Sequence, residues 1–186
     1  MSMTTAKFTL EEYERMGERG VFEGIQRKRM ELIRGEIVEM TPIGPLHNHE
    51  VDYLMRWSFS CVGNQPIHIR VQGSLRIAEL VSEPEPDILW LREADYRQQH
   101  PGPEDVLLLI EVANASLADD RGEKLALYAE AGIADYWIVN CVDKQIEVYR
   151  EPEGNAYKSK QVFRGKEAAS PLVLASAKLT AAELFA

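Results

Sequence analysis

Residues 106–112 read VLLLIEV, an apolar run in which Glu111 is the one charged residue. A run that is apolar at consecutive positions is typical of a central strand covered on both faces of its sheet. Residues 86–91 read PDILWL and place Asp87 at the start of a second apolar segment. Both segments therefore predict buried strands, and each carries a carboxylate close to one end.

The chain before these strands predicts two helices and two hairpins. Thr9 with Glu12 three residues later is a capping-box pattern, and apolar residues recur at helical spacing from His47 onward. Arg34-Gly35 and Gln72-Gly73 are tight-turn signals. In chain order we expect a helix over 9–19, a hairpin of 30–33 with 36–40, a helix over 47–59, and a hairpin of 67–71 with 74–78.

The chain after the central strands predicts one long helix and further strands. Residues 119–131 have a helical pattern, and Gly132 suits a left-handed C-terminal cap. We then expect a hairpin of 135–140 with 144–150, strands near 157–163 and 172–174, and a short helix opened by Thr180. This order predicts an α/β (α+β) fold with a mixed central sheet flanked by helices. No linker or repeat divides residues 1–186, so we expect a single domain.

The chain has 186 residues, with 21 Lys and Arg against 30 Asp and Glu, and a formal net charge of −9. Such a charge gives no general attraction for nucleic acid, because that affinity comes from Lys and Arg displacing counterions. Residues 1–10 lack the apolar core of a signal peptide, no apolar run is long enough to cross a membrane, and Cys61 and Cys141 lack metal-ligand spacing. We therefore expect a reduced, cytoplasmic protein that is neither secreted nor membrane-spanning.

Four basic residues near the C-terminus share one parity, namely Lys158, Lys160, Arg164 and Lys166. In a strand they would point to one side of the sheet. Such a row is typical of a solvated strand face. A local attraction for DNA is the alternative.

Asp87 and Glu111 meet at one end of the sheet if their strands are neighbours, and two buried carboxylates repel unless they share a proton or a cation. Oxygen ligands with room for water are what Mg²⁺ requires. On the following helix, Asp120, Lys124 and Tyr128 recur at helical spacing and lie on one face. Lys124 would then place an ammonium beside the two carboxylates. The alternative is an exposed Asp120–Lys124 ion pair.

Several blocks of this sequence resemble the Uma-type family of putative restriction endonucleases, which belongs to the PD-(D/E)XK nuclease superfamily. The blocks are Pro86-Asp87, Glu111-Val112, DRGEKLALY over 120–128 and GIADYWIV over 132–139. The stretches ELIRGE over 31–36 and GPLH over 44–47 resemble the family's opening hairpin and the start of its next helix. The likeness covers roughly residues 8–150.

The resemblance implies a restriction-endonuclease-like core that hydrolyses DNA with Mg²⁺ or Mn²⁺. It implies that Asp87, Glu111 and the Val112 carbonyl hold the metal, and that Lys124 is catalytic. The superfamily's usual lysine, two residues after the glutamate, is replaced by Ala113. The resemblance implies that the lysine comes from the next helix instead, as Lys124.

We expect the substrate side of the cleft to hold His47, Glu31, Ser116 and Asp120. For Glu31 the alternative is a surface position on the hairpin, and for His47 a helix cap or a surface position. Nucleases of this superfamily often act as dimers, and pairing would unite separate basic patches, so we expect a homodimer. The competing function is that of a catalytically inactive nuclease-fold protein with a binding or structural role.

Overall fold

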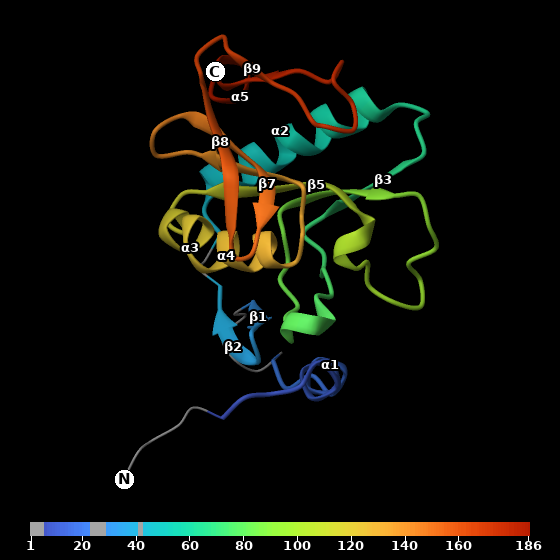
Figure 1. The fold of residues 1–186 in the computed structure, drawn as a ribbon. Coiled ribbons are helices and arrows are strands. Elements are labelled where there is room, and N and C mark those ends of the chain that lie inside the picture. The colour runs from blue at the N-terminus through green and yellow to red at the C-terminus, as the bar shows by residue number, and fades with distance from the viewer. Residues whose placement is uncertain (1–5, 23–28, 41–42) are drawn as a thin grey trace.

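A six-stranded sheet forms the centre of the computed structural model, which describes residues 6–22, 29–40 and 43–186 (Figure 1). Its strands in spatial order are β3 (Ile67–Val71), β4 (Ile88–Arg92), β5 (Val106–Ala113), β6 (Asp135–Asn140), β7 (Gln145–Glu153) and β8 (Ala156–Arg164). Strands β5 and β6 are parallel, and the other neighbours are antiparallel. The expected mixed central sheet is therefore confirmed.

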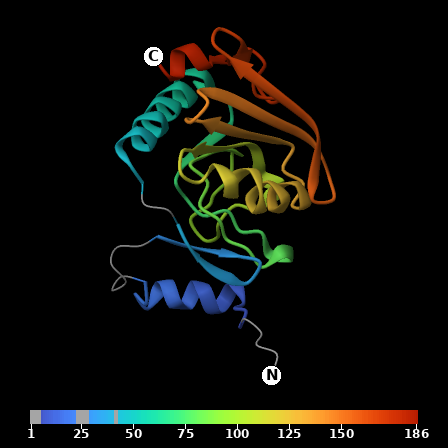
Figure 2. The same cartoon turned by 90° about the vertical axis from the view of Figure 1, so that its left-hand side faces the viewer.

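Helices cover both faces of this sheet (Figure 2). One face packs against α2 (Pro45–Val62), α5 (Ala181–Leu184) and the short pair β9 (Ala168–Ala169) and β10 (Leu179–Thr180). The other face packs against α3 (Leu117–Arg121) and α4 (Glu123–Glu130). A separate layer at one end holds α1 (Leu10–Glu18) and the hairpin of β1 (Met30–Ile33) with β2 (Glu36–Glu39) (Figure 1). Two 3-10 turns, η1 (Ala78–Leu80) and η2 (Pro103–Asp105), lie in the connections.

Alternate residues of the central strands enter two different cores. Trp90, Ile110 and Trp137 belong to the cluster on the α2 side, whereas Leu109 and Tyr136 belong to the cluster on the α4 side. All five side chains are fully buried. Because strand side chains alternate between faces, a strand covered on both sides must be apolar at consecutive positions, which explains the sequence of residues 106–112.

The expected strand over 74–78 is wrong. The backbone amide of Leu75 donates to Pro84, that of Arg76 to Pro101, and that of Ile77 to Ser82. Strand β3 instead pairs with β4. The turn signal at Gln72 is real, since its φ is +48°, but the chain then leaves the sheet and its amides bond to connecting segments instead.

The expected strand over 172–174 is also wrong. Leu172 is 57% exposed and Val173 is 40% exposed, so these apolar residues do not face the core. The strands in this part of the chain are β9 and β10, which pair with each other. The final helix begins after Thr180, whose side chain accepts from the backbone of Glu183, as its capping box predicts.

The helix expected over 119–131 is two helices that meet at Gly122. Its backbone there has φ −105° and ψ −103°, which is outside the helical region. A Cβ at this position would lie 2.8 Å from the carbonyl oxygen of Ala118. The sequence pattern missed the break because glycine is compatible with either conformation.

Gly122→Ala is expected to destabilise the protein by at least about 1 kcal/mol, because the added Cβ meets backbone that cannot rotate away. Gly17→Ala in α1 is the matched control, since a Cβ there would have no other atom within 4 Å, and alanine there stabilises a helix by about 1 kcal/mol. Urea unfolding of both variants measures the difference. Equal stabilisation by the two substitutions would mean that residues 119–131 form a continuous helix.

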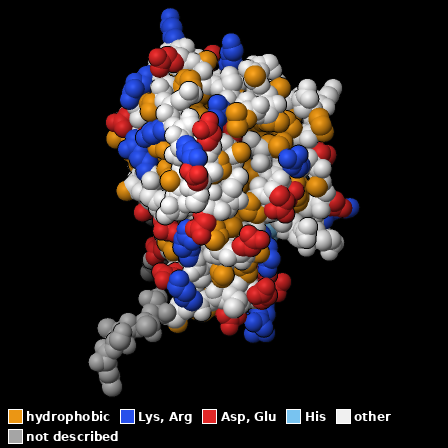
Figure 3. Space-filling view, in the orientation of Figure 1, with side chains coloured by type: hydrophobic (Ala, Val, Ile, Leu, Met, Phe, Trp, Pro, Cys, Tyr) orange, Lys and Arg blue, Asp and Glu red, His pale blue; other side chains and the backbone are white. Residues whose placement is uncertain are grey.

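The basic residues near the C-terminus lie on and just beyond β8, an edge strand, where Lys and Arg side chains gather on the surface (Figure 3). Lys158 pairs with Glu153 at 2.8 Å, and Lys160 pairs with Glu147 at 2.9 Å. These ion pairs partly neutralise the strand face, which agrees with its interpretation as a solvated face of the sheet. A second basic run, RKR over 27–29, stands out in the sequence; of it Arg29 is described, while Arg27 and Lys28 lie outside the described residues.

Candidate active site

A cavity of about 190 Å³ opens beside the ends of β4 and β5. It lies where the β1–β2 hairpin, the start of α2 and the α3–α4 pair meet. Its lining includes every residue that the sequence analysis assigned to a site: Glu31, His47, Asp87, Glu111, Val112, Ser116, Asp120 and Lys124.

Asp87 and Glu111 come together because β4 and β5 pair in antiparallel register. Ile88 lies opposite Ile110, and the next residues outward are Asp87 and Glu111. Both are buried, with exposed fractions of 5% and 3%. The Asp87 backbone amide donates to Glu111 Oε2 at 3.4 Å. The expected convergence of these two residues at one sheet end is therefore present in the structure.

Asp87 is held by three donors. The Val112 backbone amide donates to Oδ2 at 2.8 Å, and Oδ1 lies 2.9 Å from His47 Nε2 and 3.2 Å from Gln72 Nε2. Burial of Asp87 opposes its ionisation, but these hydrogen bonds and the nearby His47 outweigh burial and lower the pKa of Asp87. Asp87 is therefore a fixed carboxylate.

Glu111 is held from the α4 side. Its Oε1 accepts from Lys124 Nζ at 3.0 Å and from the Tyr128 hydroxyl at 2.8 Å. Burial raises the pKa of Glu111, and the charge of Lys124 opposes that rise. Burial would lower the pKa of Lys124, but the surrounding carboxylates, led by Glu111, raise it, so this side chain is an ammonium.

Lys124 is not in an exposed ion pair with Asp120, so that alternative is wrong. Its side chain is 14% exposed and also donates to Glu31 Oε1 at 3.2 Å. Asp120 is buried and accepts from the Ser116 hydroxyl at 2.7 Å. Ser116 occupies the N-cap position of α3 without a side-chain cap bond, because its hydroxyl is used by Asp120.

Glu31 and His47 are not surface residues. Glu31 is 3% exposed, because β1 bridges to the segment before Asp87 through Leu32 and Glu83. Its Oε1 also accepts from the Glu85 backbone amide at 2.7 Å. Pro45 opens α2 at a position suited to proline, which sets His47 in the first turn with a side chain 16% exposed. The surface alternatives for both residues are therefore wrong.

Two side chains in contact with the carboxylates received no role from the sequence. Tyr128 lies one helical turn after Lys124, and that spacing was the signal that could have assigned it to Glu111. Gln72 contacts Asp87 from the position read only as a turn. The irregular segment over 74–85 separates Gln72 from Asp87 in the chain, so no local sequence pattern connects the two residues.

The donor set is compatible with a divalent cation. Four buried carboxylates, those of Glu31, Asp87, Glu111 and Asp120, line the cavity together with Lys124, its one lysine among the described residues. Carboxylate and carbonyl oxygens are the ligands that Mg²⁺ prefers. Among the described residues no group of three or more His, Cys, Asp or Glu side chains is arranged to hold a metal ion. Two carboxylates with water would suit Mg²⁺, which usually keeps several waters.

Comparison with solved structures gives a match to the crystal structure of a putative nuclease belonging to DUF820 from Anabaena variabilis ATCC 29413, determined at 1.96 Å. The match has a TM-score of 0.73 and 17% sequence identity, and it covers 96% of this chain and 97% of the other. At this identity the likeness shows a shared fold. Among curated proteins, none matches the chain. No helix within the described ranges is long and apolar enough to cross a membrane.

Comparison with protein families gives a match to Uma2, described as putative restriction endonuclease, over residues 10–182. The match includes the hairpin of Glu31, both carboxylate-bearing strands and the helix of Lys124. It continues through β10. Because the match covers nearly the whole sequence, the chain belongs to the Uma2 family of putative restriction endonucleases.

Proposed function

We propose that this protein is a metal-dependent endonuclease that hydrolyses phosphodiester bonds in DNA. The observation that carries the proposal is the contact of the Lys124 ammonium with Glu111, 3.0 Å away, beside Asp87 on the neighbouring strand. Two carboxylates and one ammonium in a partly enclosed cavity suit the binding of a cation and the stabilisation of a phosphate in its transition state.

Asp87, Glu111 and the Val112 carbonyl would hold Mg²⁺ or Mn²⁺. A bound divalent cation supplies electrostatic stabilisation of phosphate and lowers the pKa of water. The chain keeps Asp87 in place through the Val112 amide, His47 and Gln72. It keeps Glu111 in place through Tyr128 and Lys124. Both carboxylates are therefore oriented by the protein itself.

Lys124 would stabilise negative charge that develops on the phosphate. Its ammonium is fixed by Glu111 and Glu31, which reduces the reorganisation needed during reaction. His47, Ser116, Asp120 and Glu31 line the remaining wall, where they would contact the substrate. Ser116 is bonded to Asp120, so its hydroxyl position is defined before substrate binds.

We further propose that the protein acts in the cytoplasm as a homodimer. With a net charge of −9, one chain has little general attraction for DNA. Pairing of two chains would place two cavities and two sets of basic residues on one substrate. Sedimentation at micromolar concentration tests the association, and a monomer there would contradict it.

The experiment for the proposed function compares wild type with Asp87→Ala and Asp95→Ala on supercoiled and branched DNA, with Mg²⁺, Mn²⁺ or EDTA. Wild type and Asp95→Ala are expected to nick DNA only with a divalent metal. Asp87→Ala should be slower by about 10³-fold, since loss of a metal ligand removes several kcal/mol of transition-state stabilisation. Asp95 is the matched control because its side chain is 58% exposed and pairs with Arg97.

Equal cleavage by all three proteins would identify a contaminating nuclease. Absence of cleavage by folded wild type on every substrate would favour an inactive nuclease-fold protein with a binding or structural role. Retention of metal-dependent activity by Asp87→Ala would show that the cavity beside β4 and β5 is not the site.

A further inference from the structure

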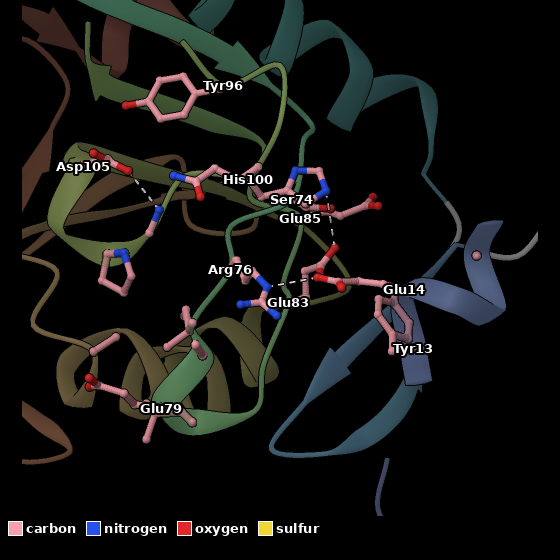
Figure 4. A pocket seen from close by; sticks show the side chains of 18 of the residues that line it. Tyr13, Glu14, Ser74, Arg76, Glu79, Glu83, Glu85, Tyr96, His100 and Asp105 are labelled. Atoms are coloured by element: carbon pink, nitrogen blue, oxygen red, sulfur yellow. Dashed lines mark hydrogen bonds and ion pairs between the residues drawn. The ribbon is translucent and has the colours of Figure 1, made fainter. Parts of the chain in front are cut away.

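A second cavity, of about 1270 Å³, lies on the other side of the β1 strand from the candidate active site. Its walls come from α1, from the irregular segment over 74–85 and from the loop over 93–105 (Figure 4). Arg29 lines both cavities, but none of the residues assigned to the nuclease site lines this one. This second cavity is therefore distinct from the candidate active site.

The lining of this second cavity is strongly acidic. Among the described residues that line it, carboxylate side chains outnumber arginines by eight to three, and none is a lysine. An acidic cavity repels the phosphates of nucleic acid and attracts cations. The expected ligand is therefore of opposite charge to the substrate of the nuclease site.

Glu83 is the buried member of this acidic lining. It is 5% exposed, and its Oε2 atom is buried without a hydrogen-bond partner within the described part of the chain. His100 Nε2 lies 3.8 Å from Glu83 Oε1, beyond hydrogen-bond distance. Burial raises the pKa of Glu83 despite a hydrogen bond from Ser74. A carboxylate that is removed from water and left incompletely bonded is costly unless something else binds it.

The arginine beside Glu83 is already engaged. Arg76 donates from Nε to Glu14 at 2.9 Å and from a terminal nitrogen to Glu11 at 3.4 Å. Figure 4 shows the Glu83 carboxylate between this Arg76–Glu14 pair and His100. Glu85 is likewise paired, with Arg29 at 2.6 Å. Among the described carboxylates that line this cavity, Glu83 is thus the one with a buried oxygen that has no hydrogen-bond partner.

We propose that this cavity binds a small organic cation whose primary ammonium group pairs with Glu83. The ammonium takes the place of the distant contact with His100, whose side chain is 47% exposed. The cavity is large enough for a small molecule.

The test is calorimetric titration of the full chain with putrescine (1,4-diaminobutane) at constant ionic strength, beside the uncharged 1,4-butanediol. We expect saturable binding of putrescine and none of the diol. Glu83→Gln should weaken putrescine binding by about tenfold or more, since it removes a charged hydrogen bond. Glu79→Gln is the matched control, because Glu79 lines the same cavity but is exposed, and its affinity should change by less than about twofold.

Three results would overturn the proposal: no saturable binding of putrescine, equal binding of the diol, or equal weakening by Glu83→Gln and Glu79→Gln. A second variant keeps the test valid if Glu83→Gln fails to fold. Ala78 is exposed on the cavity wall, so Ala78→Lys adds a competing ammonium while Glu83 stays intact. Putrescine binding should then be lost, and wild-type affinity in this variant would equally overturn the proposal.

Discussion

Lys124→Met is expected to slow metal-dependent DNA nicking by about 10²- to 10³-fold, the cost of removing one preorganised electrostatic group from an active site. The ammonium is buried against Glu111 and Glu31, at 3.0 and 3.2 Å. Methionine keeps the length and the apolar stem of the side chain but removes its charge. Nicking rates of supercoiled DNA, measured with Mg²⁺ at a saturating protein concentration, give the size of the effect.

Lys158→Met is the matched control for Lys124→Met. It makes the same change of charge on a side chain that is 57% exposed and pairs with Glu153 on the sheet edge, so its nicking rate should stay near that of wild type. Lys124→Arg should not restore the rate, because a planar guanidinium is larger and directs its donors differently from a compact ammonium. Wild-type activity in a folded Lys124→Met protein would remove Lys124 from the mechanism.

Glu147→Ala is expected to cost about 3 kcal/mol of unfolding free energy, because loss of this carboxylate leaves the buried polar donors around it without an acceptor. Glu147 on β7 is fully buried. It accepts from Arg121 at the end of α3, from Lys160 on β8 and from three polar side chains of the same sheet, those of Asn140, Gln145 and Tyr149. Urea unfolding at pH 7 measures the loss.

The stabilisation by Glu147 should also depend on pH. Burial opposes its ionisation, but hydrogen bonds led by that from Arg121 outweigh burial and lower the pKa of Glu147. A lowered pKa stabilises the fold above the ordinary glutamate pKa, and this stabilisation is lost as the pH falls toward the folded-state value. The difference between wild type and Glu147→Ala should therefore be larger at pH 7 than at pH 3.

The control for Glu147 is Glu153→Ala on the same strand. Glu153 has a side chain 67% exposed and pairs with Lys158, so its loss should cost less than about 1 kcal/mol at either pH. A loss for Glu147→Ala that equals that of Glu153→Ala would show that the buried hydrogen bonds of Glu147 contribute no net stability.

The central strands could be predicted because their patterns are local. Residues 106–110 are apolar at consecutive positions, which is typical of a strand buried on both faces. The capping boxes at Thr9 and Thr180 fixed two helix starts for the same reason, since each depends on a pair of residues three apart. The antiparallel pairing of β4 and β5 then gave the meeting of Asp87 and Glu111.

The errors fall where distant segments decide the conformation. Residues 74–78 have a strand-like pattern, but their amides bond to Ser82, Pro84 and Pro101 in connecting segments. Gly122 separates α3, which packs on β5 and β6, from α4, which packs on β7 and β8, although the local pattern predicts one continuous helix. Neither outcome is encoded in the spacing of neighbouring residues.

The sequence by itself determined which chemical groups stand at the strand ends, namely Asp87 and Glu111, and which helix carries the lysine. Only the tertiary structure decided how these groups are paired. Glu31, which lies 93 residues before Lys124 in the chain, reaches it because the β1–β2 hairpin docks on the segment before Asp87. The spacing of Asp120 and Lys124 also allowed a solvated ion pair between them. Burial instead encloses the Lys124 ammonium, which Glu111 and Glu31 hold. The physical reason is that the energy of a charge depends on its distance to other charges and on its exposure to water, and folding sets both.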